Sequence, residues 1–215
     1  MRMRRKKHGA ERIAACTAIN IPTPISEPTD PNTWFEVARP VHLEIGCGKG
    51  DFAVGMSEKH PDTNWIAMER VPDVACLALE KAMRHAEKRP DNLRFLIGDA
   101  RNLGEWFPPH SVDTLYLNFS DPWPKKGYAK RRLTHVGFLE LYRAVLKEGG
   151  LLRFKTDNEG LFDFSLEQFA DAGLTVEWMT RDLHASEKAE ENVMTEYERN
   201  FSSKGQVIYS AWVRF

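Results

Sequence analysis

The sequence lacks the features of a secreted, membrane-spanning or metal-binding protein. Its 215 residues contain only three cysteines, which are odd in number and have no metal-ligand spacing, so we expect reduced thiols in a cytoplasmic protein. No apolar run approaches the ~18–20 residues that a membrane span requires, and no apolar segment of a secretory signal follows the basic start. The seven histidines include no His-x-x-x-His pair. We therefore expect one cytoplasmic domain of ordinary size without a structural metal.

Positive charge is scarce outside two short stretches of the chain. The sequence has 30 lysines and arginines against 31 aspartates and glutamates, yet residues 1–12 hold six of the basic residues and residues 125–132 hold five. The remaining residues therefore carry a clear acidic excess. This distribution favours contact with the phosphates of a polyanion, with solvated charge runs as the alternative. We expect residues 1–12 to be disordered or to be ordered by a partner.

Apolar runs alternate with helical stretches after residue 40, whereas residues 1–40 form the basic arm and a proline-rich connector. Strands are expected at residues 41–45, 64–68, 93–97, 112–118, 151–154, 174–178 and 206–213. Helices are expected at residues 51–59, 73–89, 133–147 and 161–172, the third of them closed by Gly149-Gly150. The alternation predicts a single α/β domain over residues 41–215, with a doubly wound, seven-stranded, mostly parallel sheet. Ligands of such sheets bind beyond the carboxyl ends of the strands.

A glycine-rich turn follows the first expected strand of the domain. Gly46, Gly48 and Gly50 allow the backbone to pass close to a ligand. A dinucleotide fingerprint needs a third glycine one residue later, where this chain has Asp51. Together with Glu44 at the strand end, this carboxylate disfavours a pyrophosphate and suits a cationic or zwitterionic ligand.

Carboxylates also end the next two expected strands. Glu69 is placed to accept hydrogen bonds from a ribose diol, and Asp99 is placed to accept one from the exocyclic amine of adenine. Each residue alone is more often a solvated loop acid. Together with Glu44 they favour an adenosine group without phosphates, as in S-adenosylmethionine, over ATP or NAD.

Five motifs in order along the chain resemble those of the bacterial tRNA (guanine-N7-)-methyltransferases. They are Leu43-Glu44-Ile45-Gly46-Cys47-Gly48-Lys49-Gly50, Asn118-Phe119-Ser120-Asp121-Pro122-Trp123-Pro124-Lys125-Lys126, Lys130-Arg131-Arg132-Leu133, Phe154-Lys155-Thr156-Asp157-Asn158 and Thr195-Glu196-Tyr197-Glu198. The resemblance covers nearly the whole chain. It implies a Rossmann-like class I methyltransferase that uses S-adenosylmethionine to methylate N7 of the guanine at position 46, in the variable loop of tRNA.

The resemblance also implies roles for individual residues. The cofactor contacts would be Glu44, Gly46, Gly48, Glu69, Asp99 and Asp121, and the substrate contacts would be Lys125, Lys130, Arg131, Arg132, Asp157, Thr195, Glu196, Tyr197 and Glu198. Gly127 and Tyr128 depart from the Arg-His that family members often show, which removes a charge from the basic loop. Tyr128 either stacks on a base or packs within the protein. No obligate protein partner is expected, and we expect a monomer or a weak homodimer.

The chemistry singles out Asp121 as the catalytic residue. Guanine N7 has an in-plane lone pair and no proton, so methylation needs no base to deprotonate it. Positioning and negative charge near the developing cation are then the main sources of catalysis. Asp121 follows the fourth expected strand, and Pro122 restricts its backbone to extended conformations. The alternative is that Asp121 only caps a turn.

The sequence alone is compatible with other interpretations. Asp157 and Glu198 either contact base edges or riboses, or form salt bridges with Lys155 or Arg199. Residues 181–195 have mixed charges and no period, so we expect a mobile segment that becomes ordered with tRNA. The alternatives to this function are methylation of an exocyclic amine of RNA and RNA binding without catalysis by a protein with the methyltransferase fold. A nicotinamide dehydrogenase is disfavoured by the glycine spacing.

Overall fold

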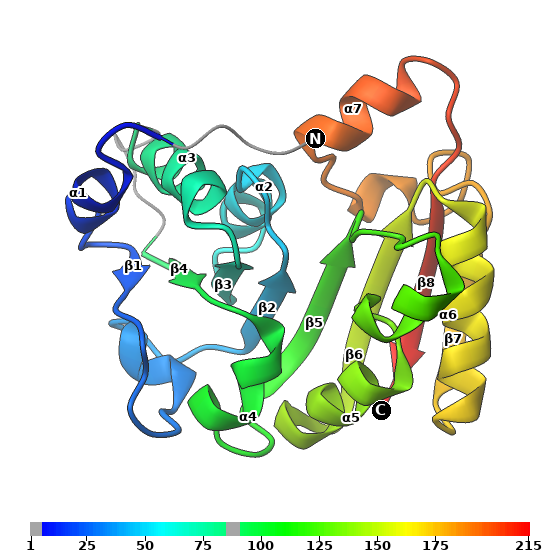
Figure 1. Ribbon diagram of the computed structural model, residues 1–215, viewed down its shortest axis with the longest axis horizontal. Coiled ribbons are helices and arrows are strands. Elements are labelled where there is room, and N and C mark those ends of the chain that lie inside the picture. The colour runs from blue at the N-terminus through cyan, green and yellow to red at the C-terminus, as the bar shows by residue number, and fades with distance from the viewer. Residues whose placement is uncertain (1–5, 85–90) are drawn as a thin grey trace. The chain divides into compact units, whose positions relative to one another are not determined.

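The computed structural model describes residues 6–84 and 91–215, and the chain divides into two compact units, residues 1–108 and 109–215 (Figure 1). The expectation of one domain over residues 41–215 stays a prediction.

The first unit contains a parallel sheet in the order β1-β4-β3-β2. Its strands are β1 (Asn20–Ile21), β2 (Val41–Ile45), β3 (Asn64–Glu69) and β4 (Leu93–Ile97). Its helices are α1 (Gly9–Ala14), α2 (Asp51–Lys59), α3 (Pro72–Arg84) and α4 (Leu103–Trp106), with 3-10 turns η1 (Pro31–Trp34) and η3 (Ala100–Asn102). Ile45 pairs in register with Met68, and Glu69 pairs with Ile97. The turns that follow β2, β3 and β4 therefore gather at one edge of this sheet.

The second unit contains a mixed sheet in the order β5-β6-β8-β7. Its strands are β5 (Val112–Asn118), β6 (Leu146–Thr156), β7 (Thr175–Thr180) and β8 (Tyr209–Arg214); β5 and β6 are parallel, and β8 is antiparallel to both β6 and β7. Its helices are α5 (Val136–Val145), α6 (Glu159–Asp171) and α7 (Glu196–Ser202), with 3-10 segments η4 (Lys126–Arg131) and η5 (Ala189–Glu191). Phe154 of β6 packs against Phe162 and Phe169 of α6 at 6.3 Å between ring centroids, so α6 covers one face of the sheet.

The α/β class and the mostly parallel pairing are confirmed, but the strand count is one too low. In the described part of the chain there are eight strands, because Asn20–Ile21 pairs with β4 inside a connector expected to be irregular. The helix expected at 133–147 is shorter, since the His135 ring caps it by accepting from the amide N–H of Gly137. Gly149 has a φ of 70° and lies within β6, so it is part of a strand and does not end a helix. The last residues of the helix expected at 73–89 lie outside the described residues.

The basic arm is folded against its own unit from residue 6 onward, which neither expectation for residues 1–12 anticipated. The guanidinium of Arg12 donates to both carboxylate oxygens of Glu80 on α3, at 2.6 and 2.7 Å. The backbone N–H of Lys6 donates to Asp73 at 2.7 Å. Acidic side chains on α3 thus bind the arm, a pairing that composition could not reveal.

Residues 181–195 are also attached to their unit, where a mobile segment was expected. Trp178 of β7 donates its indole N–H to Glu187 at 2.5 Å, and the Lys188 ammonium lies 4.5 Å from the ring centroid of Trp212. Leu183 is buried and donates its backbone N–H to Ile208 at 2.7 Å. The mixed charges of this segment therefore pair with aromatic residues of the sheet.

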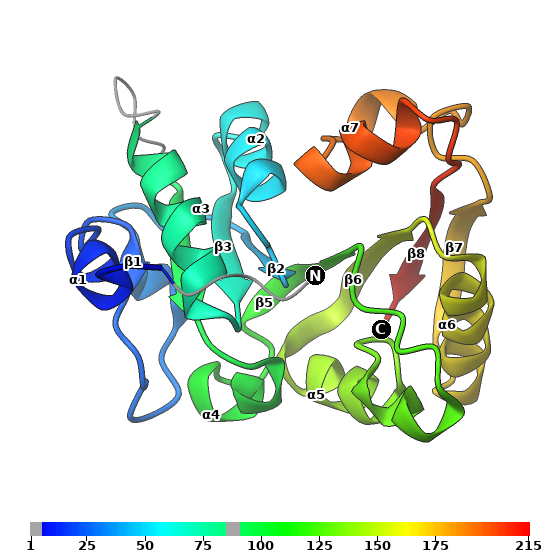
Figure 2. The same cartoon turned by 45° about the horizontal axis from the view of Figure 1, so that its top comes forward.

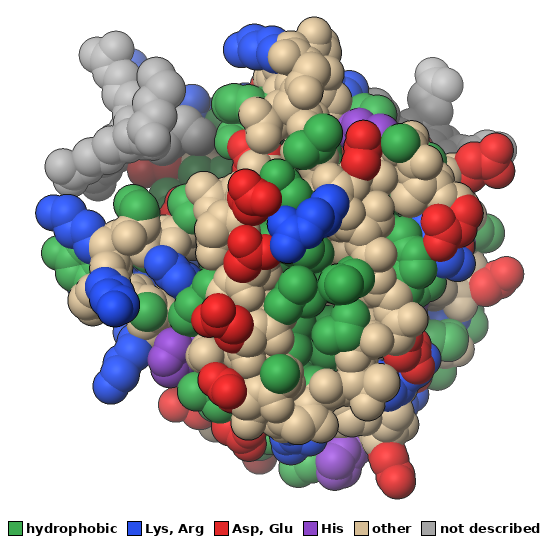
Figure 3. All heavy atoms as spheres, turned by 90° about the vertical axis from the view of Figure 1, so that its right-hand side faces the viewer, with side chains coloured by type: hydrophobic (Ala, Val, Ile, Leu, Met, Phe, Trp, Pro, Cys, Tyr) green, Lys and Arg blue, Asp and Glu red, His purple; other side chains and the backbone are tan. Residues whose placement is uncertain are grey.

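The side of the second unit that carries α6 and β7 shows a small group of hydrophobic side chains among scattered acidic ones (Figure 3). Met179 of β7 has 57% of its surface exposed.

None of the helices in the described ranges has the length and hydrophobicity needed to span a bilayer.

Candidate cofactor and acceptor regions

The glycine turn after β2 is open where a ligand would approach it. Gly46 and Gly48 have φ values of 80° and 57°, which favour glycine, and a Cβ built on either one would meet no atom within 4 Å. Gly50 also has a positive φ, but a Cβ there would lie 3.1 Å from Ala78 and 3.3 Å from Phe95. Gly46 and Gly48 thus leave space at the strand ends, whereas Gly50 allows close packing.

Glu69 connects the glycine turn to the end of β3. One carboxylate oxygen accepts from the backbone N–H of Gly48 at 3.0 Å and the other from that of Val71 at 2.8 Å. Burial raises the pKa of Glu69, although these backbone hydrogen bonds oppose the rise. Each oxygen has a further lone pair for a ribose hydroxyl.

Glu44 lies close to the same turn but inside the protein. Only 1% of its surface is exposed. Burial, and then the charges of Glu44 and Glu69, raise the pKa of the buried Cys47 thiol well above its ordinary value. The turn is thus electronegative, which suits a ligand that carries an ammonium or sulfonium group.

Asp99 lies at the end of β4, as expected, but a neighbouring arginine already contacts it. Arg101 donates to its two oxygens at 2.9 and 2.7 Å, and this hydrogen bonding lowers the pKa of the Asp99 carboxyl. The residue before Asp99 is a glycine, Gly98, because a Cβ at that position would lie 2.0 Å from the Trp106 ring. An adenine amine would have to share Asp99 with Arg101 or displace it.

The turn after β5 holds Asp121 in an exposed position. Phe119 and Trp123 on either side have φ values of 54° and 41°, both in the left-handed region. Phe119 donates its backbone N–H to the carbonyl of Lys155 at 2.9 Å, which attaches the start of the turn to β6.

The basic loop after this turn forms η4, which the sequence did not predict. Lys125, Lys130 and Arg131 are exposed, as a phosphate-binding role requires. The Arg131 guanidinium lies 5.0 Å from the ring centroid of Trp123 and 4.6 Å from that of Tyr128. Tyr128 thus packs within the loop while 41% of its surface stays exposed, so packing and base stacking are compatible.

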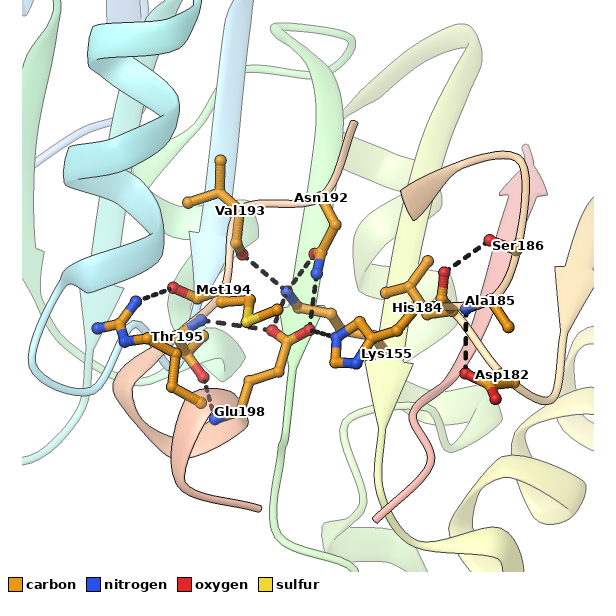
Figure 4. A network of polar contacts seen from close by, with 12 residues as sticks. Lys155, Asp182, His184, Ala185, Ser186, Asn192, Val193, Met194, Thr195 and Glu198 are labelled. Carbon is orange, nitrogen blue, oxygen red and sulfur yellow. Dashed lines mark hydrogen bonds and ion pairs between the residues drawn. The ribbon is translucent and has the colours of Figure 1, made fainter. Parts of the chain in front are cut away.

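The motif Thr195-Glu196-Tyr197-Glu198 forms a helix cap, and this cap is joined to a buried ion pair (Figure 4). Thr195 and Glu198 form a capping box at the start of α7, a Thr-x-x-Glu pattern that the sequence analysis missed. The Glu198 carboxylate lies 2.7 Å from the Lys155 ammonium and 2.8 Å from His184 Nε2, and it accepts from the Asn192 side-chain amide at 2.7 Å. The salt bridge between Glu198 and Lys155 is therefore present.

A direct contact between Glu198 and substrate stays a prediction, and this geometry disfavours it because Glu198 has no exposed surface. The exposed residue of the motif is Tyr197, whose hydroxyl donates to Asp157 at 2.9 Å. The partial burial of its hydroxyl, and then this carboxylate, raise the pKa of Tyr197 to about 12. α7 lies where β6 ends and β8 begins, so Tyr197 and Asp157 meet at that edge of the sheet (Figures 1 and 2).

The structure thus separates the expected residues into groups. In the first unit it brings together the glycine turn, Glu44 and Glu69, with Asp99 at the neighbouring strand end. In the second unit it brings together Asp157, Thr195, Tyr197 and Glu198. His184 and Asn192 were not singled out from sequence, and no local pattern marks them.

The fold and these strand-end residues define a Rossmann-like class I methyltransferase. The 16S rRNA methyltransferase KamB has this fold, with a TM-score of 0.63, 15% identity, and coverage of 90% of this chain and 96% of that one. A SAM-dependent methyltransferase from Aquifex aeolicus has a TM-score of 0.57 at 14% identity, covering 97% of this chain and 99% of that one. The family model described as "Putative methyltransferase" matches residues 38–211.

Full-length relatives identify the family. A tRNA (guanine-N(7)-)-methyltransferase of Streptococcus agalactiae is 43% identical over 219 residues, covering 100% of both chains. One of Lysinibacillus sphaericus is 44% identical over 209 residues, covering 97% of this chain and 95% of the relative. The chain belongs to the tRNA (guanine-N(7)-)-methyltransferase family.

Proposed function

We propose that this protein transfers a methyl group from S-adenosylmethionine to N7 of the guanine at position 46 in the variable loop of tRNA, which forms 7-methylguanosine. The observation that carries the proposal is similarity to enzymes of that name over the whole chain, with all five motifs present in order. We place the activity in the cytoplasm, where tRNA is processed.

The donor assignment is supported by the chemistry of the first unit. Glu69 is anchored by two backbone N–H groups and keeps acceptor capacity for a ribose diol. Gly46 and Gly48 leave room beside the backbone. S-adenosylmethionine supplies an electrophilic methyl group on a sulfonium, and the electronegative turn around Glu44 favours that positive charge.

The acceptor assignment gives different tasks to the residues of the second unit. We propose Lys125, Lys130 and Arg131 as phosphate contacts, because they are exposed cations on one short loop. We propose Asp157 and Tyr197 as contacts to polar edges of the RNA, with Thr195, Glu196 and Glu198 shaping the start of α7.

Asp121 is proposed to act by charge and orientation. The positive charge of the donor passes to the purine during transfer, and a carboxylate near the ring stabilises it. A carboxylate can also accept from the guanine N1–H and amino group, which would place N7 toward the donor. No step requires Asp121 to take a proton from N7.

The test is to incubate the purified protein with methyl-labelled S-adenosylmethionine and unmodified bulk tRNA, digest the RNA and identify the labelled nucleoside. We expect labelled 7-methylguanosine. Label on an adenosine or cytidine amine would replace the proposal with exocyclic amine methylation. Bound cofactor without any transfer would indicate a non-catalytic RNA-binding protein.

A further inference from the structure

The backbone around Asp121 is held in a conformation that needs support. Phe119 and Trp123, two residues before and two residues after it, both have positive φ. A non-glycine residue in this region costs on the order of 1–3 kcal/mol and persists only where neighbours fix it. The position of Asp121 therefore depends on what anchors the two ends of the turn.

The first end is anchored to β6. The Phe119 N–H donates to the carbonyl of Lys155 at 2.9 Å, and the Phe119 ring lies 5.2 Å from the ring of Tyr197 between centroids. This anchor uses the backbone of a buried strand residue, Lys155.

The second end is anchored by one guanidinium. Arg132 donates Nε–H to the carbonyl of Pro122 at 2.9 Å and Nη2–H to the carbonyl of Trp123 at 3.1 Å. Its guanidinium carbon lies 4.2 Å from the ring centroid of Phe164 on α6. The arginine fork thus joins two consecutive carbonyls of the turn to a helix that packs on the sheet.

We infer that Arg132 is a positioning residue for Asp121 and not a phosphate ligand of tRNA, an inference that rests on the proposed function. Two of its donors bind the turn, and its guanidinium lies over the Phe164 ring. Lys130 and Arg131 are exposed neighbours on the same loop. The Arg131 guanidinium also lies over the Trp123 ring, whereas Arg132 in addition donates to two carbonyls of the turn. One run of three basic residues therefore contains two functions.

The experiment compares Arg132→Lys and Arg132→Ala with Lys130→Ala in two measurements. The first is the single-turnover rate of methyl transfer at saturating tRNA and cofactor. The second is the slope of log Kd for tRNA against log salt between about 50 and 200 mM, which changes by ~0.7–0.9 for each lost phosphate contact.

For Arg132→Lys we expect a rate loss on the order of 100-fold, which is the cost of a misplacement of about 1 Å. Lysine keeps the charge but cannot donate to both carbonyls in a fixed fork. We expect Arg132→Ala to lose as much rate and to keep the wild-type salt slope. Lys130→Ala removes a proposed phosphate contact and should reduce the salt slope.

A wild-type rate for Arg132→Lys, or a reduced salt slope for Arg132→Ala, would overturn the inference. Thermal unfolding checks that the variants are folded. If the Arg132 variants do not fold, Phe164→Leu replaces them, because it removes the ring under the guanidinium without removing charge. It should slow transfer without altering the salt slope, and a wild-type rate would contradict the inference.

The wild-type reaction separates this inference from the proposed function. If the wild type forms no 7-methylguanosine, the proposed function fails. The salt slope needs no catalysis, so it still shows whether Arg132 contributes a phosphate contact. A slope reduced in Arg132→Ala as in Lys130→Ala would then refute the positioning role.

Discussion

Lys155 and Glu198 form an ion pair of 2.7 Å whose side chains are only 4% and 0% exposed, and this pair joins the end of β6 to the start of α7. The Lys155 ammonium also donates to the Asn192 side-chain oxygen at 2.8 Å and to the Val193 carbonyl at 3.0 Å. Such a pair offsets its large desolvation cost only when every partner is in place. Tyr197 lies between Thr195 and Glu198, the two residues of the capping box at the start of α7. The position of this exposed tyrosine therefore depends on a buried network.

Removal of the Glu198 charge should destabilise the protein strongly. Glu198→Gln leaves the Lys155 ammonium buried without its counter-charge, and we expect a loss of about 3–5 kcal/mol in the free energy of unfolding. Urea denaturation followed by circular dichroism measures it. The double variant Lys155→Met with Glu198→Gln should recover part of the loss, and a double variant as unstable as the sum of both singles would contradict the buried-charge explanation.

The same carboxylate should contribute to acid sensitivity. Burial alone would raise the pKa of Glu198, but the charge of Lys155 and hydrogen bonds from Lys155, His184 and Asn192 lower it below its ordinary value. The stabilisation is therefore complete above the unfolded-state pKa of ~4.3 and is lost as pH falls through the folded value. Unfolding free energies measured on the acid side should fall less steeply in Glu198→Gln than in the wild type.

Tyr197 should ionise later than an ordinary tyrosine. Its pKa is raised to about 12 by burial and by the Asp157 carboxylate that its hydroxyl contacts. The raised value favours the folded state below the unfolded-state pKa of ~10, and this advantage is lost as pH rises through the folded value. Absorbance titration of tyrosinate should lose a late-titrating group in Tyr197→Phe. A group that instead titrates at the ordinary pKa would show that the contact is absent in solution.

Glu69 should control cofactor affinity. Glu69→Ala removes the acceptor of the Gly48 and Val71 N–H groups together with the proposed ribose contact, so we expect Kd for S-adenosylmethionine to rise at least about tenfold. Because the pKa of Glu69 is raised, affinity should weaken on acidification before an ordinary glutamate would protonate. Isothermal titration calorimetry tests both effects. The matched control is Glu58→Ala, which removes an exposed carboxylate on α2 and should bind as the wild type does.

Asp121→Asn should lower the rate of methyl transfer by a factor that does not depend on pH. A preorganised charge lost near the developing cation costs on the order of 100-fold. Single-turnover rates across the pH range measure the effect, with tRNA and cofactor saturating. A wild-type rate that followed the ionisation of one carboxylate, with that dependence lost in Asp121→Asn, would indicate acid–base catalysis instead.

Much of the fold could be predicted because its signals are local. The strands at Val41–Ile45, Leu93–Ile97 and Val112–Asn118 and the helix at Asp51–Lys59 have the expected bounds, since apolar runs and glycine turns lie within a few residues of one another. The strand Asn20–Ile21 could not be predicted, because two residues become a strand only through their pairing with β4.

The candidate site shows the same division. The sequence by itself determined the family, the glycine turn and the acidic residues at strand ends, because these depend on residue type and spacing. Only the tertiary structure decided that Glu198 points inward to Lys155, that Arg12 is bound by Glu80, and that Arg132 supports the turn of Asp121. The identity of a charged residue does not reveal whether its side chain faces solvent or contacts another residue. Glu198 and Lys155 lie 43 residues apart along the chain, Arg12 and Glu80 lie 68 apart, and Arg132 and Pro122 lie 10 apart. Packing, which brings distant residues into contact, therefore decides which charges are exposed to bind a ligand and which are used to hold the protein together.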